Sequence, residues 1–246
     1  MFSDITLKRI AHLYIIIWII IILILITGFC MFHYFIAGES HVPFIISKLV
    51  VISSANTANI NLSEGEYTAE VLQNNDIYLS ISKNPKYKKE DSIKTVIIRN
   101  FKSADNVSNL EIYRPANTSQ LYTYNDNYLA DAITYNGGQY TDIRDDSLQI
   151  ANQGGTINFS IIQNHLGNIS YLENEDIKID GTLLSTLNKS IEELQIEVSF
   201  DLEITLVSGK VFYTNINLVL PSGDILTNGI SSVEYDKLDE LIYKRK

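Results

Sequence analysis

The segment of the chain that decides its fold class reads LQIEVSFDLEITL and covers residues 194–206. Apolar residues occupy every second position from Leu194 to Leu206, and a polar residue stands at each position between them. Side chains of a β-strand point alternately to the two faces of a sheet, whereas a helix would spread these apolar residues around its axis. The pattern therefore predicts a long strand that turns one face to a core and the other to water.

Segments on both sides of this stretch share its strand-favouring character. The turn at 208–210 predicts a hairpin into a second strand at 211–220. Upstream, short apolar runs separated by Gly, Asn, Asp or Pro predict strands at 67–72, 77–82, 94–101, 110–113, 128–135, 156–162 and 169–172. Turns are expected between them at 73–76, at Asn136-Gly137, at Gly154-Gly155 and at 166–168. Such a meander predicts a mainly β fold, an antiparallel β-sandwich-like domain.

The residues after position 230 carry the signals of a short C-terminal helix. Residues 231–234, SSVE, have the spacing of a capping box, and the basic residues 244–246 stand where a helix end favours cations. In such a helix Tyr235, Leu238, Leu241 and Ile242 would share one face. We expect this face either to pack on the sheet of the same domain or to bind a partner.

A second strong signal lies near the N-terminus, where residues 13–32 contain no charged side chain. A helix of this length rises about 30 Å, which matches the hydrocarbon core of a bilayer. We therefore predict a single transmembrane helix at 13–36, and we expect it to stay uncleaved because the residues after it offer a poor signal-peptidase site. Lys8 and Arg9 precede the span and only Lys48 follows it closely, so the N-terminus is expected to be cytoplasmic.

These signals divide the chain into four parts. They are a cytoplasmic stub at 1–12, the transmembrane helix at 13–36, a membrane-proximal stalk at 37–60 and an extracytoplasmic β-rich domain at 61–246. The apolar runs of the stalk are too short to cross a bilayer again, and they fit either a first strand or a collar that rests on headgroups or on a partner helix. A polar loop at 115–119 offers a point of subdivision, although a single sandwich is simpler.

The charge and the cysteine content exclude several classes of function. The chain has 19 Lys and Arg residues against 29 Asp and Glu residues, which gives a net charge of −10. Nucleic acids and anionic lipid surfaces bind proteins through basic faces, so the overall charge predicts binding to neither. Cys30 is the only cysteine and lies in the apolar segment, so the domain has no thiol for a disulfide or a thiolate metal site.

Candidate catalytic groups are few in this sequence. His41 and His165 are the only histidines beyond the apolar segment, and neither stands in a nucleophile motif. The Gly-Gly pairs lack the lysine of a phosphate-binding loop, and the acidic clusters at 142–146 and 173–180 lack the spacing of an EF-hand. We therefore predict no catalytic, cofactor-binding or metal-binding residue. A triad built from distant residues and a calcium-binding acidic loop remain as alternatives.

Tyrosine is frequent in the middle of the chain, where Tyr122, Tyr124 and Tyr128 are candidate partner-binding residues. A rigid, amphipathic ring gives contact area at low entropic cost, but tyrosine also fills the faces of sheets. Both interpretations stay open at this point.

Three functions are compatible with the sequence. The leading hypothesis is a non-enzymatic subunit of a cell-envelope assembly, such as a secretion, pilus or transport machine, anchored in the bilayer by residues 13–36 and bound to other envelope proteins. One helix and a short stub cannot conduct a solute, and the domain shows no catalytic set, which favours this hypothesis. The alternative is a surface-exposed binding module or adhesin that recognises a glycan or a protein. The third hypothesis is an exported hydrolase.

Overall fold

The computed structural model describes residues 2–103, 110–115, 130–138, 148–172, 175, 178, 180–236 and 238–246, with the side chains from His12 onward except those of Thr182 and Asp239. The helical elements are α1 (Phe2–Met31), the π-helix η1 (Phe32–Ala37), α2 (Gly181–Ser185), α3 (Ile191–Leu194), α4 (Ile225–Asn228) and the 3-10 turn η3 (Leu238–Glu240). The strands are β1 (Phe44–Ser63), β2 (Glu66–Lys83), β3 (Ile93–Ser103), β4 (Leu110–Tyr113), β5 (Ile133–Gly137), β6 (Leu148–Ile150), β7 (Gly154–Leu172), β8 (Ile196–Leu206), β9 (Val211–Leu220), β10 (Ile230–Glu234) and β11 (Lys244–Arg245).

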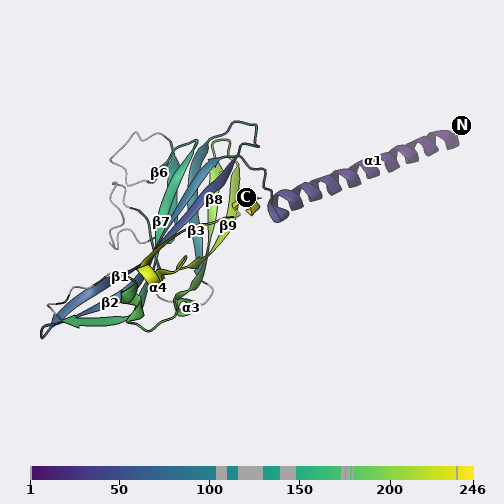
Figure 1. The fold of residues 1–246 in the computed structure, drawn as a ribbon. Helices are drawn as coiled ribbons and strands as arrows, with labels where there is room; N and C mark the ends of the chain where they lie inside the picture. The colour runs from purple at the N-terminus through teal and green to yellow at the C-terminus, as the bar shows by residue number, and fades with distance from the viewer. Residues whose placement is uncertain are drawn as a thin grey trace.

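The strands form a sandwich of two sheets, and α1 projects from one end of it (Figure 1). The first sheet has the order β10-β1-β2-β7-β4, and all its pairs are antiparallel. The second sheet has the order β11-β9-β8-β3-β5-β6 and is antiparallel except for β5 and β6. The predicted mainly β fold with one N-terminal helix is confirmed, with one parallel pair that a simple meander lacks.

The apolar N-terminal helix is confirmed as one continuous element. Residues His12–Ala37 are long and apolar enough to cross a membrane, and none of the most apolar part is buried by the rest of the chain. The stalk predicted at 37–60 is largely strand β1, which lies between β10 and β2, so the first-strand alternative holds. Each sheet combines strands from before and after the loop at 115–119, of which only Pro115 is described.

Strand β8 confirms the strand predicted from the alternating segment. The apolar side chains at every second position from Ile196 to Leu206 are all buried in one core. Leu194 instead ends the one-turn helix α3, which begins with a capping box formed by Ser190 and Glu193. A helix cap thus overrides the strand period at the first position of the segment.

Some of the predicted turns are wrong, because the chain continues through them as strand. Residues 73–76 lie in the middle of β2 and residues 166–168 lie within β7, so each pair of predicted short strands is one long strand. Asn136 and Gly137 belong to β5, which pairs with β3 on one side and with β6 on the other. The turn at 208–210 is present and joins β8 to β9.

The predicted C-terminal helix is corrected to a strand followed by a single helical turn. Residues 230–234 form β10, which pairs with β1 in the register Val51↔Val233. The 3-10 turn η3 comes next, and β11 then pairs with β9 in the other sheet. Helix formation has a costly nucleus, so hydrogen bonds to the edge of β1 outweigh the weak helical preference of so short a segment.

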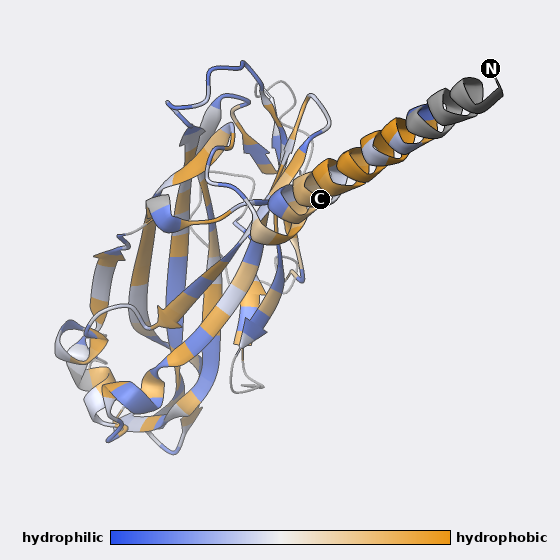
Figure 2. Cartoon of the chain, turned by 90° about the vertical axis from the view of Figure 1, so that its right-hand side faces the viewer, coloured by the Kyte–Doolittle hydropathy of each residue, from blue (hydrophilic) through white to orange (hydrophobic). Residues whose placement is uncertain are grey.

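Buried apolar side chains form two large cores on the inner side of the first sheet. The main core lies between the sheets, where the rings of Phe159 and Phe200 meet edge to face with 5.1 Å between their centroids. The second core packs α2, α3 and α4 against β1, β2 and β7, and its buried members are Ala55, Val71, Leu166, Leu183, Leu184, Leu194 and Ile225. Figure 2 shows the alternating hydropathy along the strands and the short helices at the end far from α1.

Candidate functional site

The C-terminal residues 235–243 run from the first sheet to the second and pack on the domain itself. Tyr235, Leu238 and Leu241 are half-buried and lie against the main core. Tyr243 is buried, and its hydroxyl accepts a 3.0 Å hydrogen bond from the backbone N–H of Ile46. Of the two expectations for this segment, the contacts favour packing within the domain over binding to a partner.

The same segment attaches the domain to the base of the N-terminal helix. The guanidinium of Arg245 lies 3.7 Å from the centroid of the Tyr34 ring, and its Nε donates a 2.7 Å hydrogen bond to the carboxylate of Glu39. Backbone hydrogen bonds of 2.7 and 2.9 Å also join Glu39 to Tyr243. Ile242, the fourth predicted residue of this segment, is 47 % exposed. The helix is therefore held against the folded domain where it ends.

Tyr122, Tyr124 and Tyr128, the remaining predicted partner-binding residues, lie outside the described residues, and their role stays a prediction. The structure offers a different candidate, in which exposed apolar side chains and open strand edges occur together. It is the distal arm, formed by residues 56–63 of β1, 66–72 of β2 and 164–172 of β7. Figure 1 shows these strands extending beyond the sandwich, away from α1.

Within the part of the chain that the structure describes, the distal arm presents open edges on both sides. Its middle strand is β2, which pairs with β1 and with β7. Strand β10 covers β1 only at 50–54, and β4 covers β7 only at 160–163. Among the described residues, no strand therefore pairs with the outer edges of the arm. Open edges of this kind expose backbone groups with which a strand of another chain can pair.

The tip of the distal arm carries an exposed apolar row. Ile60 and Leu62 on β1 are 54 % and 53 % exposed. Leu62 pairs in register with Tyr67, and Tyr67 pairs with Tyr171, so these three side chains share one face of the arm. The two tyrosine rings stack with 5.2 Å between their centroids. Large apolar side chains gathered on a projecting surface are typical of a site that binds another molecule.

A layer of buried polar side chains separates the distal arm and its helices from the main core. Along the inner face of β2, Asn75 and Gln73 stand between main-core residues and Val71 of the second core. The Asn75 Oδ1 accepts a 2.7 Å hydrogen bond from Ser53, and its amide nitrogen donates to the carbonyl of Ile161 at 3.2 Å. Both ends of the Asn75 amide are thus hydrogen-bonded, whereas the buried Oε1 of Gln73 has no partner among the described residues, and the hydrogen bonds of Asn75 favour one arrangement of the surrounding strands. This layer is the part of β2 that resembles a turn in the sequence.

A buried carboxylate fixes irregularities in both outer strands at the root of the arm. Asn59 and His165 lie where the register of β1 and of β7 shifts, and both have positive φ, +50° and +57°. Glu70 on β2 accepts hydrogen bonds of 2.6 Å from Asn59 Nδ2 and 2.8 Å from the backbone N–H of His165. It also contacts the His165 ring. Because a buried carboxylate is stabilised by several donors, Glu70 acts as a clamp that shapes the arm.

The described part of the chain contains few groups that could perform chemistry. Within it, no group of three or more His, Cys, Asp or Glu side chains could hold a metal ion. His41 faces Tyr87, with 5.3 Å between the ring centroids, and His165 contacts the clamp residue Glu70. The predictions of no catalytic, cofactor-binding or metal-binding residue stay predictions, and the acidic cluster at 142–146 lies outside the described residues.

One cavity of about 500 Å³ opens at the side of the sandwich. Its wall is formed by Phe101, Lys102, Ser103, Leu110, Ile112, Ile161, Val198 and Ser199. These walls contain neither a carboxylate nor an imidazole among the described residues, so they suit an apolar guest better than a hydrolytic reaction. A larger cavity of about 690 Å³ is lined by His41, Glu234 and Asp236 among other residues.

The distal arm is not predicted from the sequence, because the expected boundary between stalk and domain at residue 60 falls inside β1. A signal was present, since Glu64-Gly65 stands between Leu62 and Tyr67. Both turn residues adopt positive φ, +52° and +83°, as two-residue hairpins require. Comparison of the sequence with protein-family models, with curated proteins and with solved structures finds no match.

Proposed function

We propose that this protein is a membrane-anchored subunit of a cell-envelope assembly, whose helix α1 holds the β-sandwich at the bilayer and whose distal arm binds a protein partner. The observation that carries the proposal is the arm itself, which combines two strand edges that no described strand covers with the exposed row of Ile60 and Leu62. Edge strands are normally covered or charged in soluble proteins, because bare edges recruit other chains.

The position of the arm suits this role. It lies at the end of the domain far from α1, so a partner can approach it without meeting the bilayer (Figure 1). The buried polar layer and the Glu70 clamp order the strands that lead to it. A preformed strand edge loses less conformational entropy on binding than a flexible loop does.

In this proposed function, α1 remains part of the mature protein and its N-terminus lies in the cytoplasm. A cleavable signal sequence can have the same length and composition as this helix. The contact of Arg245 with Tyr34 supports retention, because cleavage near the end of η1 would remove this partner from the domain. The charges of Lys8 and Arg9 support the orientation.

Site-specific crosslinking in native membranes tests the proposal. A photoreactive amino acid is placed at Leu62 on the arm or, as a matched control, at Val207, which is 67 % exposed in the β8–β9 turn. We expect Leu62 to give a discrete crosslinked product that contains an integral or peripheral envelope protein, and Val207 not to give it. Ile60→Asp should abolish the product in the Leu62-labelled protein without lowering its membrane content.

The outcomes separate the proposal from its alternatives. A product seen equally at both positions, or at neither, contradicts a partner site on the arm. A product that forms only when a soluble extracellular ligand is added supports the surface-exposed binding module instead. Recovery of a chain that begins after residue 37 would show that the helix is a cleaved signal, and it would refute the anchor.

A further inference from the structure

The end of the sandwich from which α1 emerges carries a cluster of basic side chains, the basic end. Its members are Lys83, Lys86, Lys88, Lys89, Lys210, Lys244, Arg245 and Lys246. They come from the loop after β2, from the β8–β9 turn and from the C-terminal residues. These segments touch, since Ser208 Oγ donates to Asp91 at 2.6 Å and the Lys246 N–H donates to the carbonyl of Val211 at 3.1 Å.

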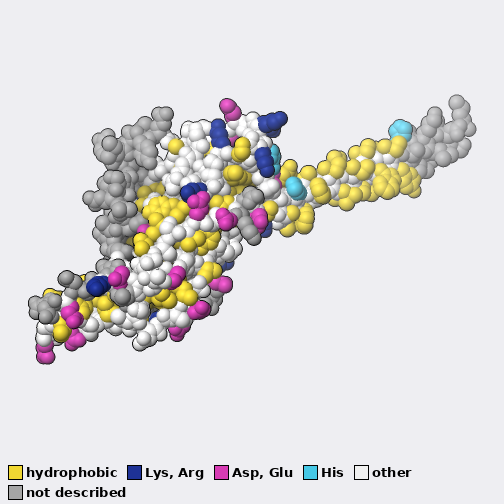
Figure 3. Space-filling model, viewed as in Figure 1, with side chains coloured by type: hydrophobic (Ala, Val, Ile, Leu, Met, Phe, Trp, Pro, Cys, Tyr) yellow, Lys and Arg dark blue, Asp and Glu magenta, His cyan; other side chains and the backbone are white. Residues whose placement is uncertain are grey.

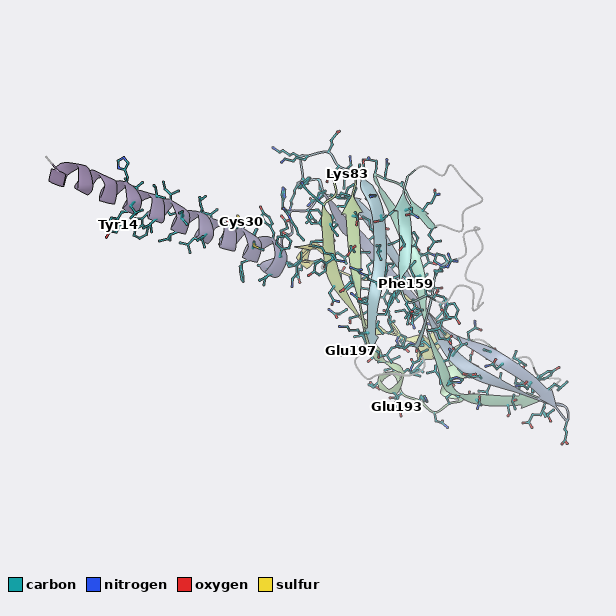
Figure 4. All side chains as sticks on the ribbon, turned by 180° about the vertical axis from the view of Figure 1, so that it is seen from behind. Tyr14, Cys30, Lys83, Phe159, Glu193 and Glu197 are labelled. Carbon is teal, nitrogen blue, oxygen red and sulfur yellow. The ribbon has the colours of Figure 1, made fainter. Side chains whose placement is uncertain are left out.

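The figures show where charged side chains lie along the domain. Lys83 lies at the end of the domain beside α1, whereas Glu193 lies toward the opposite end (Figure 4). In Figure 3, several basic side chains lie near the base of the helix together with a few acidic ones, and acidic side chains lie at the tip of the distal arm, which contains Glu64 and Glu66.

The overall charge of the chain conceals this polarity. The eight basic side chains lie in residues 83–91, 207–210 and 244–246, which also contain Glu90 and Asp91, and Arg245 and Lys246 pair with Glu39 and Glu203, so the basic end with these partners is positive by four charges. All other residues after position 37 together contain 24 acidic and nine basic side chains. The expectation that an acidic domain avoids anionic surfaces was based on the net charge. The attraction of an anion to this end depends instead on the electrostatic potential of the side chains near it.

Most of the lysines at this end lack an internal partner. Lys83, Lys86, Lys88 and Lys89 are exposed, and none of them forms an ion pair among the described residues. Like charges repel one another, so these four lysines contribute nothing favourable to the isolated domain. An external anion would turn this repulsion into attraction.

We propose that the basic end binds the phosphates of anionic phospholipid headgroups in the bilayer that α1 spans, and thereby fixes the orientation of the sandwich. This inference rests on the proposed membrane anchor. The contact between Arg245 and Tyr34 holds the basic end at the base of the helix, where headgroups begin. The distal arm lies at the opposite end of the domain, so docking of the basic end points the arm away from the bilayer toward its partner (Figure 1).

Each lysine near an anionic membrane surface raises the equilibrium constant for binding roughly fivefold, so three lysines together raise it about 100-fold.

The test uses the full chain with Cys30→Ser and with Pro85→Cys, and a fluorophore attached to the new cysteine reports on the lysine-rich loop. The protein is incorporated into nanodiscs of phosphatidylcholine alone or mixed with phosphatidylglycerol, each with a quencher on a trace of the lipid headgroups. The test variant is Lys86→Gln, Lys88→Gln and Lys89→Gln, and the matched control is Lys102→Gln, Lys178→Gln and Lys189→Gln.

We expect phosphatidylglycerol to increase quenching, added salt to reverse the increase, and inorganic phosphate with phosphatidylcholine discs to have no such effect. The Lys86, Lys88 and Lys89 variant should lower the ratio of docked to undocked domain about 100-fold, and the control should behave like the unaltered protein. Equal quenching in both lipids, or an undiminished response of the test variant, overturns the inference. Failure to enter nanodiscs at all would instead refute the membrane anchor, so the two failures are distinguishable.

Discussion

The substitution Phe200→Ala tests the central feature of the fold, the burial of one face of β8. Phe200 is fully buried, and its ring packs against Phe159 and against Phe101, with 5.1 and 5.9 Å between the ring centroids. Its loss removes the transfer free energy of the side chain and leaves a cavity, which together cost about 3–5 kcal/mol of unfolding free energy. A domain of this size has only about 5–15 kcal/mol in total.

The matched control is Ser199→Ala on the neighbouring position of the same strand. Ser199 points to the opposite face and pairs with Asn217 on β9, and it is half-exposed. Its substitution should change stability by less than about 0.5 kcal/mol. Thermal unfolding of the full chain in detergent, followed by near-ultraviolet circular dichroism, measures both variants.

A loss of 3–5 kcal/mol should lower the melting temperature by roughly 6–20 °C, because each kcal/mol corresponds to about 2–4 °C in a domain of this size. A larger effect at Ser199 would mean that the strand is shifted by one residue and that its faces are exchanged, and equal effects at both positions would mean that the segment is not a half-buried strand. Such a result would refute the arrangement of the main core.

Three further predictions concern other parts of the structure. Tyr243→Phe removes the hydroxyl that accepts the N–H of Ile46, and the unsatisfied buried N–H should cost about 1–3 kcal/mol in thermal unfolding. Burial raises the pKa of the Asp76 carboxyl above its ordinary value of 3.8. As the pH rises above 3.8, the unfolded chain therefore loses this proton before the folded protein does, and the free energy of unfolding falls until the folded carboxyl ionises as well. Asp76→Asn should make the melting temperature depend less on pH in this range. Gly229→Ala should lower the melting temperature more than Gly209→Ala, because both have positive φ but only a Cβ at Gly229 meets backbone atoms, the nearest at 2.5 Å.

Local sequence patterns determined the elements whose environment is uniform along their length. The apolar run that becomes α1 needs no tertiary partner to be helical, because a chain in an apolar medium satisfies its backbone groups within the helix. The alternation from Ile196 to Leu206 also predicted its strand correctly, because the side chains of β8 point alternately into the core and to the other face of the sheet along the whole strand. The hairpin at 208–210 followed from its turn residues.

Sequence patterns predicted the wrong secondary structure where the environment of a strand changes along its length or is supplied by a distant strand. Residues 73–76 of β2 are polar because they cross the buried layer between two cores, and this layer exists only after β1 and β7 have paired with β2. Residues 231–234 have the spacing of a capping box, but the edge of β1 is available to them and a strand results. In both cases hydrogen bonds to distant strands outweigh local preference.

The candidate surfaces likewise depended on tertiary structure. From the sequence, Tyr235, Leu238 and Leu241 were expected either to pack on their own domain or to bind a partner, and the crossing from β10 to β11 packs them against the main core. The distal arm and the basic end are assembled from residues far apart in the chain, and pattern within a segment carries no information on such proximity. The amino-acid sequence by itself determined the apolar helix and the strand character of the domain, whereas only the folded sheets decided which edges stay open and where charge collects, because both depend on long-range pairing.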